Sequence, residues 1–251
     1  METKERESAV LRVIELSGTL DSDGVGCMLR KFPDVLSWKC DLGIGPLHWW
    51  ATKGNGDAVR LLLAHGANVN GRDVNGCTPL MTCTYLDDTH MAGLLLEHGA
   101  DPNATDLLGN SPMIEAIDEP DVRMVELLLS KNADPNIQHA LGLPAVEHAI
   151  CNDEFTIVKL LLQYGAEPDM DFLLCGIYRY PNIDPVVYYD LLLGFDVDLL
   201  RPDKDGNHPI FLALEEQNEI VVNYFVQKGV SLGLKDRHGE SIQSILARLM
   251  N

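Results

Sequence analysis

Histidine and cysteine are the residue types in this sequence whose side chains most readily support catalysis or metal binding. The chain has eight histidines and six cysteines. None of the cysteines forms a CxxC pair, and no HExxH, GxSxG or Cys-His hydrolase motif occurs. The sequence therefore predicts reduced thiols that pack mostly as small apolar groups, no metal, no cofactor and no catalytic residues.

Glycine-rich loops could instead bind the phosphates of a nucleotide. Gly24-Val25-Gly26 and Gly43-Ile44-Gly45 are GxG fragments, but neither follows an expected strand or has the third glycine of a dinucleotide-binding loop. We interpret both as turn residues, and no small-molecule ligand is expected.

The balance of charge indicates which classes of partner the chain can bind. The 19 Lys and Arg residues against 38 Asp and Glu residues give a formal charge of -19, which repels nucleic-acid phosphates and anionic lipid. The same charge would attract a basic protein surface, although acidity also serves solubility alone, and both interpretations stay open here. The charged first residues and the lack of a run of about 20 apolar residues favour a cytoplasmic protein without a membrane segment.

A repeat of 33 residues organises the chain and would position any functional side chain. The glycines that keep this spacing are Gly43, Gly76, Gly109 and Gly142 and, after a gap of 64, Gly206 and Gly239. Leucine triplets repeat with the same step at 61–63, 94–96, 127–129 and 160–162, and after a step of 31 at 191–193. Self-similarity at such a period indicates a solenoid, with two residues deleted from one repeat.

Each repeat is expected to contain a turn, a short helix, a loop and a longer helix. Thr78 supplies an N-cap hydroxyl and Pro79 fits the first helical position, so a helix is predicted to begin there. The leucine triplets give the second helix a wide apolar stripe, and Gly66, Gly99 and Gly165 mark where that helix ends. Because neither helix can bury its stripe alone, neighbouring repeats are predicted to stack around a continuous core.

These segments resemble the ankyrin repeat. Residues 78–80 resemble its signature T-P-L-H-x-A, as do 45–48, 111–113 and 208–210, and 65–70, 98–103 and 131–136 match the ending of its second helix. The resemblance covers about residues 40 to 251 and implies an all-α ankyrin-repeat solenoid of stacked helix-turn-helix units with hairpin-like turns. We predict about six central repeats between two caps in a single domain: cap 1–39, regular repeats 40–171, irregular repeat 172–202, sixth repeat 203–235 and cap 236–251. The caps are predicted to have helices at 9–16, 25–32 and 242–250.

The resemblance also implies structural roles for several polar residues and for one aromatic residue. His48 is expected to tie neighbouring turns by hydrogen bonds, and Trp50 to repack the helices around it. Asparagines at the hairpins are interpreted as turn residues and not as sites of hydroxylation: Asn70, Asn103 and Asn136. Acids just before the second helices are predicted to cap them: Asp87, Asp88, Asp121 and Asp153.

Partner-binding candidates follow from the same resemblance, which implies contacts at the hairpin tips and on the inner face of the first helices. Tips normally carry polar residues, so apolar tips are candidate contacts: Leu42, Leu107 and Leu108. At the ends of the inner helices the candidates are Tyr85, Asp118, Glu119, Glu215 and Glu216. Carboxylates at a helix C-terminus oppose its dipole, so these acids could serve a basic ligand.

The repeat at 172–202 departs most from the pattern. It has no T-P-L-H segment, and four of the seven tyrosines fall between Tyr178 and Tyr189. Tyr178, Arg179 and Tyr180 are either partner-binding anchors or filler in a degenerate repeat, and both interpretations stay open. Tyr188 and Tyr189, on the second helix, are predicted to fill core volume.

The sequence thus predicts a non-catalytic protein-protein interaction module that binds and inhibits, masks or neutralises a partner with a basic surface through its concave face. A scaffold that joins two proteins, or an assembly chaperone, is the alternative. An effector enzyme is the least favoured hypothesis, because only Arg179, Asp184 and Asp190 could act within the irregular repeat.

Overall fold

The computed structural model describes residues 2–152, 154–167, 186, 189–190, 193–194, 202 and 208–249. It divides into two compact units, Met1–His148 (the N-terminal unit) and Ala149–Asn251 (the C-terminal unit). Most of the predicted irregular repeat, with Tyr178, Arg179 and Tyr180, lies outside the described residues.

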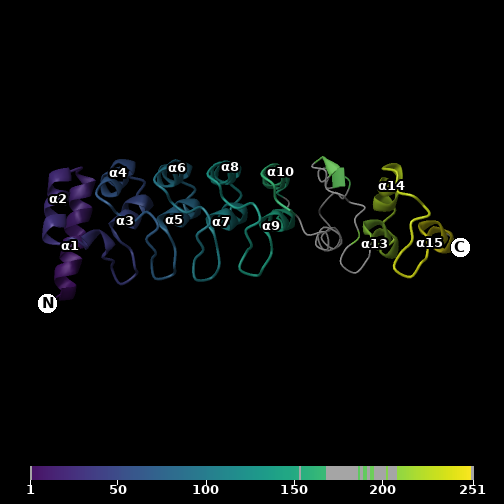
Figure 1. Ribbon diagram of the computed structural model, residues 1–251, viewed down its shortest axis with the longest axis horizontal. Coiled ribbons are helices and arrows are strands. Elements are labelled where there is room, and N and C mark those ends of the chain that lie inside the picture. The colour runs from purple at the N-terminus through teal and green to yellow at the C-terminus, as the bar shows by residue number, and fades with distance from the viewer. Residues whose placement is uncertain are drawn as a thin grey trace. The chain divides into compact units, whose positions relative to one another are not determined.

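Helices account for the regular structure of the N-terminal unit. They are α1 (Glu2–Gly18), α2 (Ser22–Lys31), the short 3-10 helix η1 (Val35–Ser37), α3 (Pro46–Thr52), α4 (Gly56–Ala64), α5 (Pro79–Tyr85), α6 (Thr89–Glu97), α7 (Pro112–Asp118), α8 (Val122–Ser130) and the first half of α9 (Ala145–Cys151). Helices α3, α5 and α7 pack side by side in a first row. Helices α4, α6 and α8 form a second row on one side of it, and the hairpin loops extend from its other side (Figure 1). The predicted stack of helix pairs is confirmed here.

The predicted helix boundaries are confirmed in the regular repeats, whereas in the N-terminal cap α1 (Glu2–Gly18) is longer than the predicted 9–16 and α2 (Ser22–Lys31) begins earlier than the predicted 25–32. The hydroxyl of Thr78 accepts a hydrogen bond from the backbone N–H of Met81 at 3.3 Å, and α5 begins at Pro79. The second helices end at residues with left-handed φ, 87° at Gly66 and 86° at Gly99. Asn132 takes the same conformation, with φ of 64°, where its repeat lacks the glycine.

The core of the N-terminal unit lies between the two rows of helices. Leu62, Leu95 and Leu128, the same position in successive leucine triplets, are completely buried. Trp50 packs against α1, because its indole N–H donates to the hydroxyl of Ser17 at 2.7 Å and its ring covers Gly18. A Cβ at Gly18 would lie 2.6 Å from the Trp50 ring. The predicted repacking around Trp50 is therefore confirmed, and it joins α1 to α3.

The C-terminal unit contains α10 (Phe155–Gln163), α13 (Pro209–Glu215), α14 (Glu219–Gln227) and α15 (Ile242–Leu249). Helix α13 packs against α14 and α15. Tyr189 is buried, with ring centroids 5.7 Å from Tyr224 and 4.8 Å from Phe225. The predicted filling of core volume is confirmed for Tyr189, and Tyr188 lies outside the described residues.

Candidate functional site

The second and third hairpin turns of the N-terminal unit are each held by their own aspartate. The Asp73 carboxylate accepts hydrogen bonds from the backbone N–H groups of Asn75 and Cys77, both at 2.8 Å. Asp106 repeats the arrangement with Leu108 at 2.8 Å and Asn110 at 2.9 Å. Because the carboxylate satisfies the turn from within, the side chains at the tip are not needed to hold it together.

Neighbouring hairpins are also bonded to one another. The N–H of Val74 donates to the carbonyl of Leu42 at 3.2 Å, and the N–H of Leu107 donates to the carbonyl of Asn75 at 2.9 Å. The Arg72 guanidinium reaches the Thr105 carbonyl one repeat further on, at 2.5 Å. These bonds fix successive tips as one array before any partner arrives, which lowers the entropy cost of binding.

Apolar side chains occupy the tips of this array. We call them the tip ridge: Leu42, Val74, Leu107, Leu108 and Leu141. Their exposed fractions run from 52% at Val74 to 89% at Leu141. Three of them are sequence candidates, whereas Leu141 was missed, although it precedes the periodic Gly142 just as Leu108 precedes Gly109. Large apolar side chains so exposed are typical of surfaces that another molecule covers.

The inner-helix ends of the N-terminal unit present a second group of candidates. Tyr85 is exposed at the last residue of α5, and Asp118 and Glu119 are exposed at the end of α7. Asp118 is already engaged, because its carboxylate lies 2.6 Å from Nε2 of His148, whose ring stacks on His139 at 5.2 Å. The structure thus leaves Glu119 as the acid at this end without a partner in the described part of the chain.

The two remaining acidic candidates belong to the C-terminal unit. Glu215 is the last residue of α13 and Glu216 is its C-cap. Both are exposed, and neither forms an ion pair among the described residues. Like Glu119, they oppose the dipole of the helix that they end, so they contribute little to stability.

One of the predicted helix caps is wrong. Asp88 accepts from the N–H of Met91 at 2.9 Å and Asp121 from that of Arg123 at 2.9 Å, so both cap as predicted. Asp87 instead takes a left-handed φ of 60° between α5 and α6 and is exposed. Its pKa is raised by the neighbouring Asp121 carboxylate. Asp153 lies outside the described residues.

The structural roles predicted for the histidine and asparagines are confirmed where the structure gives their contacts. Nε2 of His48 donates to the carbonyl of Cys77 in the next hairpin at 3.1 Å. Asn70 accepts from the N–H of Asp101 at 2.8 Å, and Asn103 accepts from that of Asp134 at 2.8 Å. These residues join neighbouring repeats, so they are not available as catalytic groups or ligands.

We expect the stability of the chain below neutral pH to depend on His48. Burial lowers the pKa of His48 from 6.5, more strongly than the hydrogen bond with Cys77 raises it. The unfolded chain therefore binds this proton more readily. Stability is fully present above the unfolded pKa and falls as the pH drops from there to the folded pKa, by at most about 1.4 kcal/mol per pH unit.

Urea unfolding at about pH 7.5 and about pH 5.5 measures this dependence. The decrease in the free energy of unfolding from about pH 7.5 to about pH 5.5 should be smaller in His48→Gln than in the wild type. It should be unchanged in His90→Gln, because His90 is exposed on α6. A His48→Gln variant that keeps the full wild-type loss would contradict the assignment.

The cysteines follow the prediction only in part. Five are described, all as free thiols. Cys83 is buried, and burial raises its pKa to about 12. Cys27 and Cys40, however, are exposed, because they lie on α2 and on the first hairpin rather than on a stripe that faces the core.

The described residues offer neither a metal site nor a membrane span. No three His, Cys, Asp or Glu side chains gather there in a way that could hold a metal ion. No helix in the same residues is long and apolar enough to cross a membrane.

Comparison with known families gives two matches. A model of ankyrin repeats in three copies matches residues 25–106, and a model of one ankyrin repeat matches residues 108–140. No curated protein gives a significant match to the chain. The matched residues contain three of the five side chains of the tip ridge, whereas Leu107 falls between the two matches and Leu141 follows directly after the second.

Proposed function

Because this chain is an ankyrin-repeat protein, we propose that it binds a partner protein on the tip ridge and the inner-helix ends and masks the partner's surface. Ankyrin repeats are protein-protein interaction modules and are typically non-catalytic, and their stacked arrangement offers an extended binding surface. In this proposal the chain is not an enzyme, acts in the cytoplasm and inhibits by occupying a surface that its partner needs.

The tip ridge is the observation that carries the proposal. Its five side chains are large, apolar and more than half exposed, yet no hydrogen bond that holds the turns comes from them: the turns are held by backbone bonds and by the side chains of Arg72, Asp73, Asp106 and His139. Polar residues would serve those turns equally well. Contact with another protein gives the apolar side chains a role that turn formation does not.

A basic partner surface is proposed from charge. The chain has a formal charge of -19, and Glu119, Glu215 and Glu216 are exposed without ion pairs among the described residues. Such carboxylates would speed the encounter with a basic protein and would select against acidic ones. A scaffold with one partner on each compact unit is the second candidate, and the stoichiometry of the purified complex separates the two.

Charge reversal tests the basic partner. Binders of the wild-type chain are first identified by capture from lysate and mass spectrometry, and then purified. For Glu215→Lys/Glu216→Lys we expect Kd to rise about tenfold at low salt and the difference to shrink as salt screens the charges. The matched control is Glu97→Lys/Glu126→Lys, which makes the same change in charge on the exposed sides of α6 and α8. Equal affinities for the two double variants would show that the overall charge, and not these residues, acts on the partner.

A further inference from the structure

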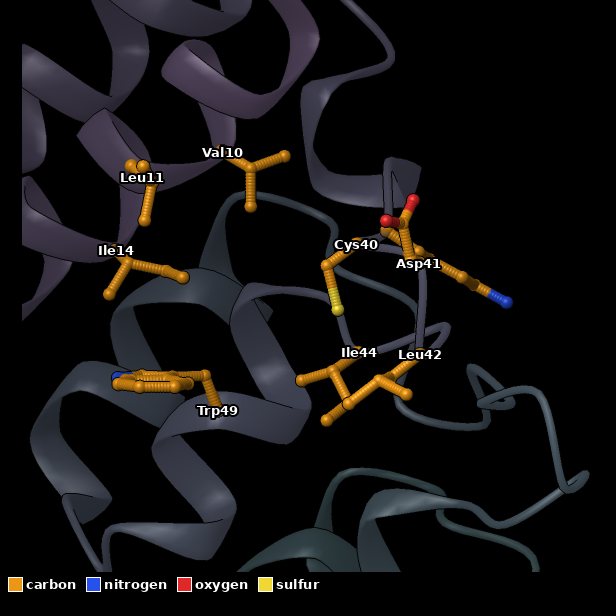
Figure 2. A pocket seen from close by; sticks show the side chains of 9 residues that line it. Val10, Leu11, Ile14, Cys40, Asp41, Leu42, Ile44 and Trp49 are labelled. Atoms are coloured by element: carbon orange, nitrogen blue, oxygen red, sulfur yellow. The ribbon is translucent and has the colours of Figure 1, made fainter. Parts of the chain in front are cut away.

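An apolar pocket of about 470 Å³ opens between α1 and the first hairpin of the N-terminal unit. We call it the N-terminal pocket, and its lining residues are Val10, Leu11, Ile14, Lys39, Cys40, Asp41, Leu42, Ile44 and Trp49. Figure 2 shows the aliphatic side chains of α1 on one side, those of the hairpin on another, and the flat Trp49 ring on a third. Three separate segments of the chain therefore build this pocket.

The apolar walls of the pocket are covered only in part by the chain itself: Val10 is buried and the Lys53 ammonium lies 5.2 Å from the centroid of the Trp49 ring, but three other apolar lining groups are open. Leu11 is 66% exposed, Leu42 62% and Trp49 41%. Leu11 also lies outside the stripe of α1 that packs into the core, where Val10 and Val13 are buried. An indole ring and two leucines left open to water around one hollow are typical of a binding site for an apolar group.

The charged groups at the rim indicate the charge of the ligand group that would lie next to that apolar group. The Lys39 ammonium is engaged, because it donates to the backbone carbonyl of Arg72. Asp41 is exposed and makes no hydrogen bond or ion pair among the described residues. The rim therefore offers one carboxylate to a cation. The pocket wall has few polar groups that could orient a polar small molecule.

We propose that the N-terminal pocket binds a segment of the partner protein that inserts a Leu, Ile, Met or Phe side chain and places a neighbouring Lys or Arg against Asp41. The inference rests on the proposed function, since it concerns the same partner. Leu42 belongs both to the pocket and to the tip ridge, and its carbonyl accepts the N–H of Val74 on the next tip. A partner that lies along the tip ridge would thus reach the pocket without a gap.

The size of the pocket agrees with this occupant. Pockets that bury organic ligands span about 300–1,000 Å³, and interface energy concentrates in a few large side chains seated in such hollows. A basic residue beside the anchor also agrees with the charge of -19 on the whole chain. The same charge disfavours anionic lipid as the source of the apolar group.

The test uses random 12-residue peptides displayed on phage and selected on the full chain. We expect the selected peptides to share a Leu, Ile, Met or Phe next to a Lys or Arg. The Kd of the synthetic peptides should rise at least tenfold on Leu11→Glu, a change at an exposed position that leaves the core intact. On Asp41→Lys the Kd should rise several-fold and recover when the basic residue of the peptide is replaced by Glu.

The position of the bound peptide is read from the chain labelled with 5-fluorotryptophan. The fluorine signal of Trp49, assigned with Trp49→Phe, should move on titration. That of Trp50 should not, because the Trp50 ring is packed on Gly18 and bonded to Ser17. Peptides without a shared apolar and basic pattern, or peptides that bind Leu11→Glu as well as the wild type, would overturn the proposal.

Two other results would overturn the proposal, because each would show that something other than a partner protein occupies the pocket. Phosphatidylcholine vesicles that shift the Trp49 signal where the peptides do not would assign the pocket to lipid. Dimerisation of the chain that is lost in Leu11→Glu would assign it to a second copy. If the selected peptides still shift Trp49 but variants of the tip ridge leave the affinity for the whole partner unchanged, the proposed function fails and the pocket proposal stands.

Discussion

Gly43→Ala should lower the free energy of unfolding by about 2–4 kcal/mol, whereas Gly66→Ala should lower it by only about 1 kcal/mol. Both glycines have a left-handed backbone, with φ of 75° and 87°. The cost of placing a Cβ in that conformation is therefore common to the two variants. What differs is the space around the added carbon.

At Gly43 the space is filled by the backbone of the next hairpin. The added Cβ would lie 2.4 Å from the N atom of Val74 and 2.6 Å from the carbonyl carbon of Asp73, whereas at Gly66 nothing lies within 4 Å. A backbone cannot rotate away as a side chain can, so the second hairpin must shift and the bond from Val74 to Leu42 must weaken.

Urea unfolding of the two variants and the wild type, followed by circular dichroism, measures the difference between the two sites. Equal losses for Gly43→Ala and Gly66→Ala would mean that the hairpins do not approach each other as closely as described. Such a result would also remove the argument that the tips form one preorganised array.

Much of the frame of the site was predictable, because it depends on local chemistry. The 33-residue spacing predicted the turn at Gly76 and the helix start at Pro79, and both follow from backbone conformations that few other residues adopt as readily. The exposure of Leu107 and Leu108 also followed from their place in the turn.

Contacts between repeats were not predictable in the same way. The hydrogen bond between Asp118 and His148 joins residues 30 positions apart, and it depends on how closely α7 and α9 are stacked. The cap at Asp88 rather than Asp87 depends on a single left-handed residue at the end of α5. A pattern of residue types does not specify distances of this kind.

The N-terminal pocket illustrates the same limit. Its walls come from α1, which carries no ankyrin signature, and from the first hairpin and α3. The sequence marked Leu42 as an exposed tip, but the neighbouring Leu11 became meaningful only when α1 was placed against the first repeat. One signal was present in the sequence: Leu11 is a large apolar residue outside the stripe formed by Val10, Val13 and Leu16, which is buried.

Leu107→Ser/Leu108→Ser is expected to weaken partner binding about 30-fold, because truncation of two central apolar contacts costs about 2 kcal/mol. Both side chains are about three-quarters exposed, at 75% and 76%, so their loss should leave the free energy of unfolding nearly unchanged. The control is Glu97→Ala/Glu126→Ala, at exposed positions of α6 and α8 away from the tips.

If the apolar tips hold a partner protein, the most direct test is to measure the Kd of a purified binder for the wild-type chain, the leucine variant and the glutamate control. We expect a Kd about 30-fold higher for the leucine variant and an unchanged Kd for the glutamate control, with equal unfolding midpoints. A leucine variant that binds as tightly as the wild type would contradict this expectation.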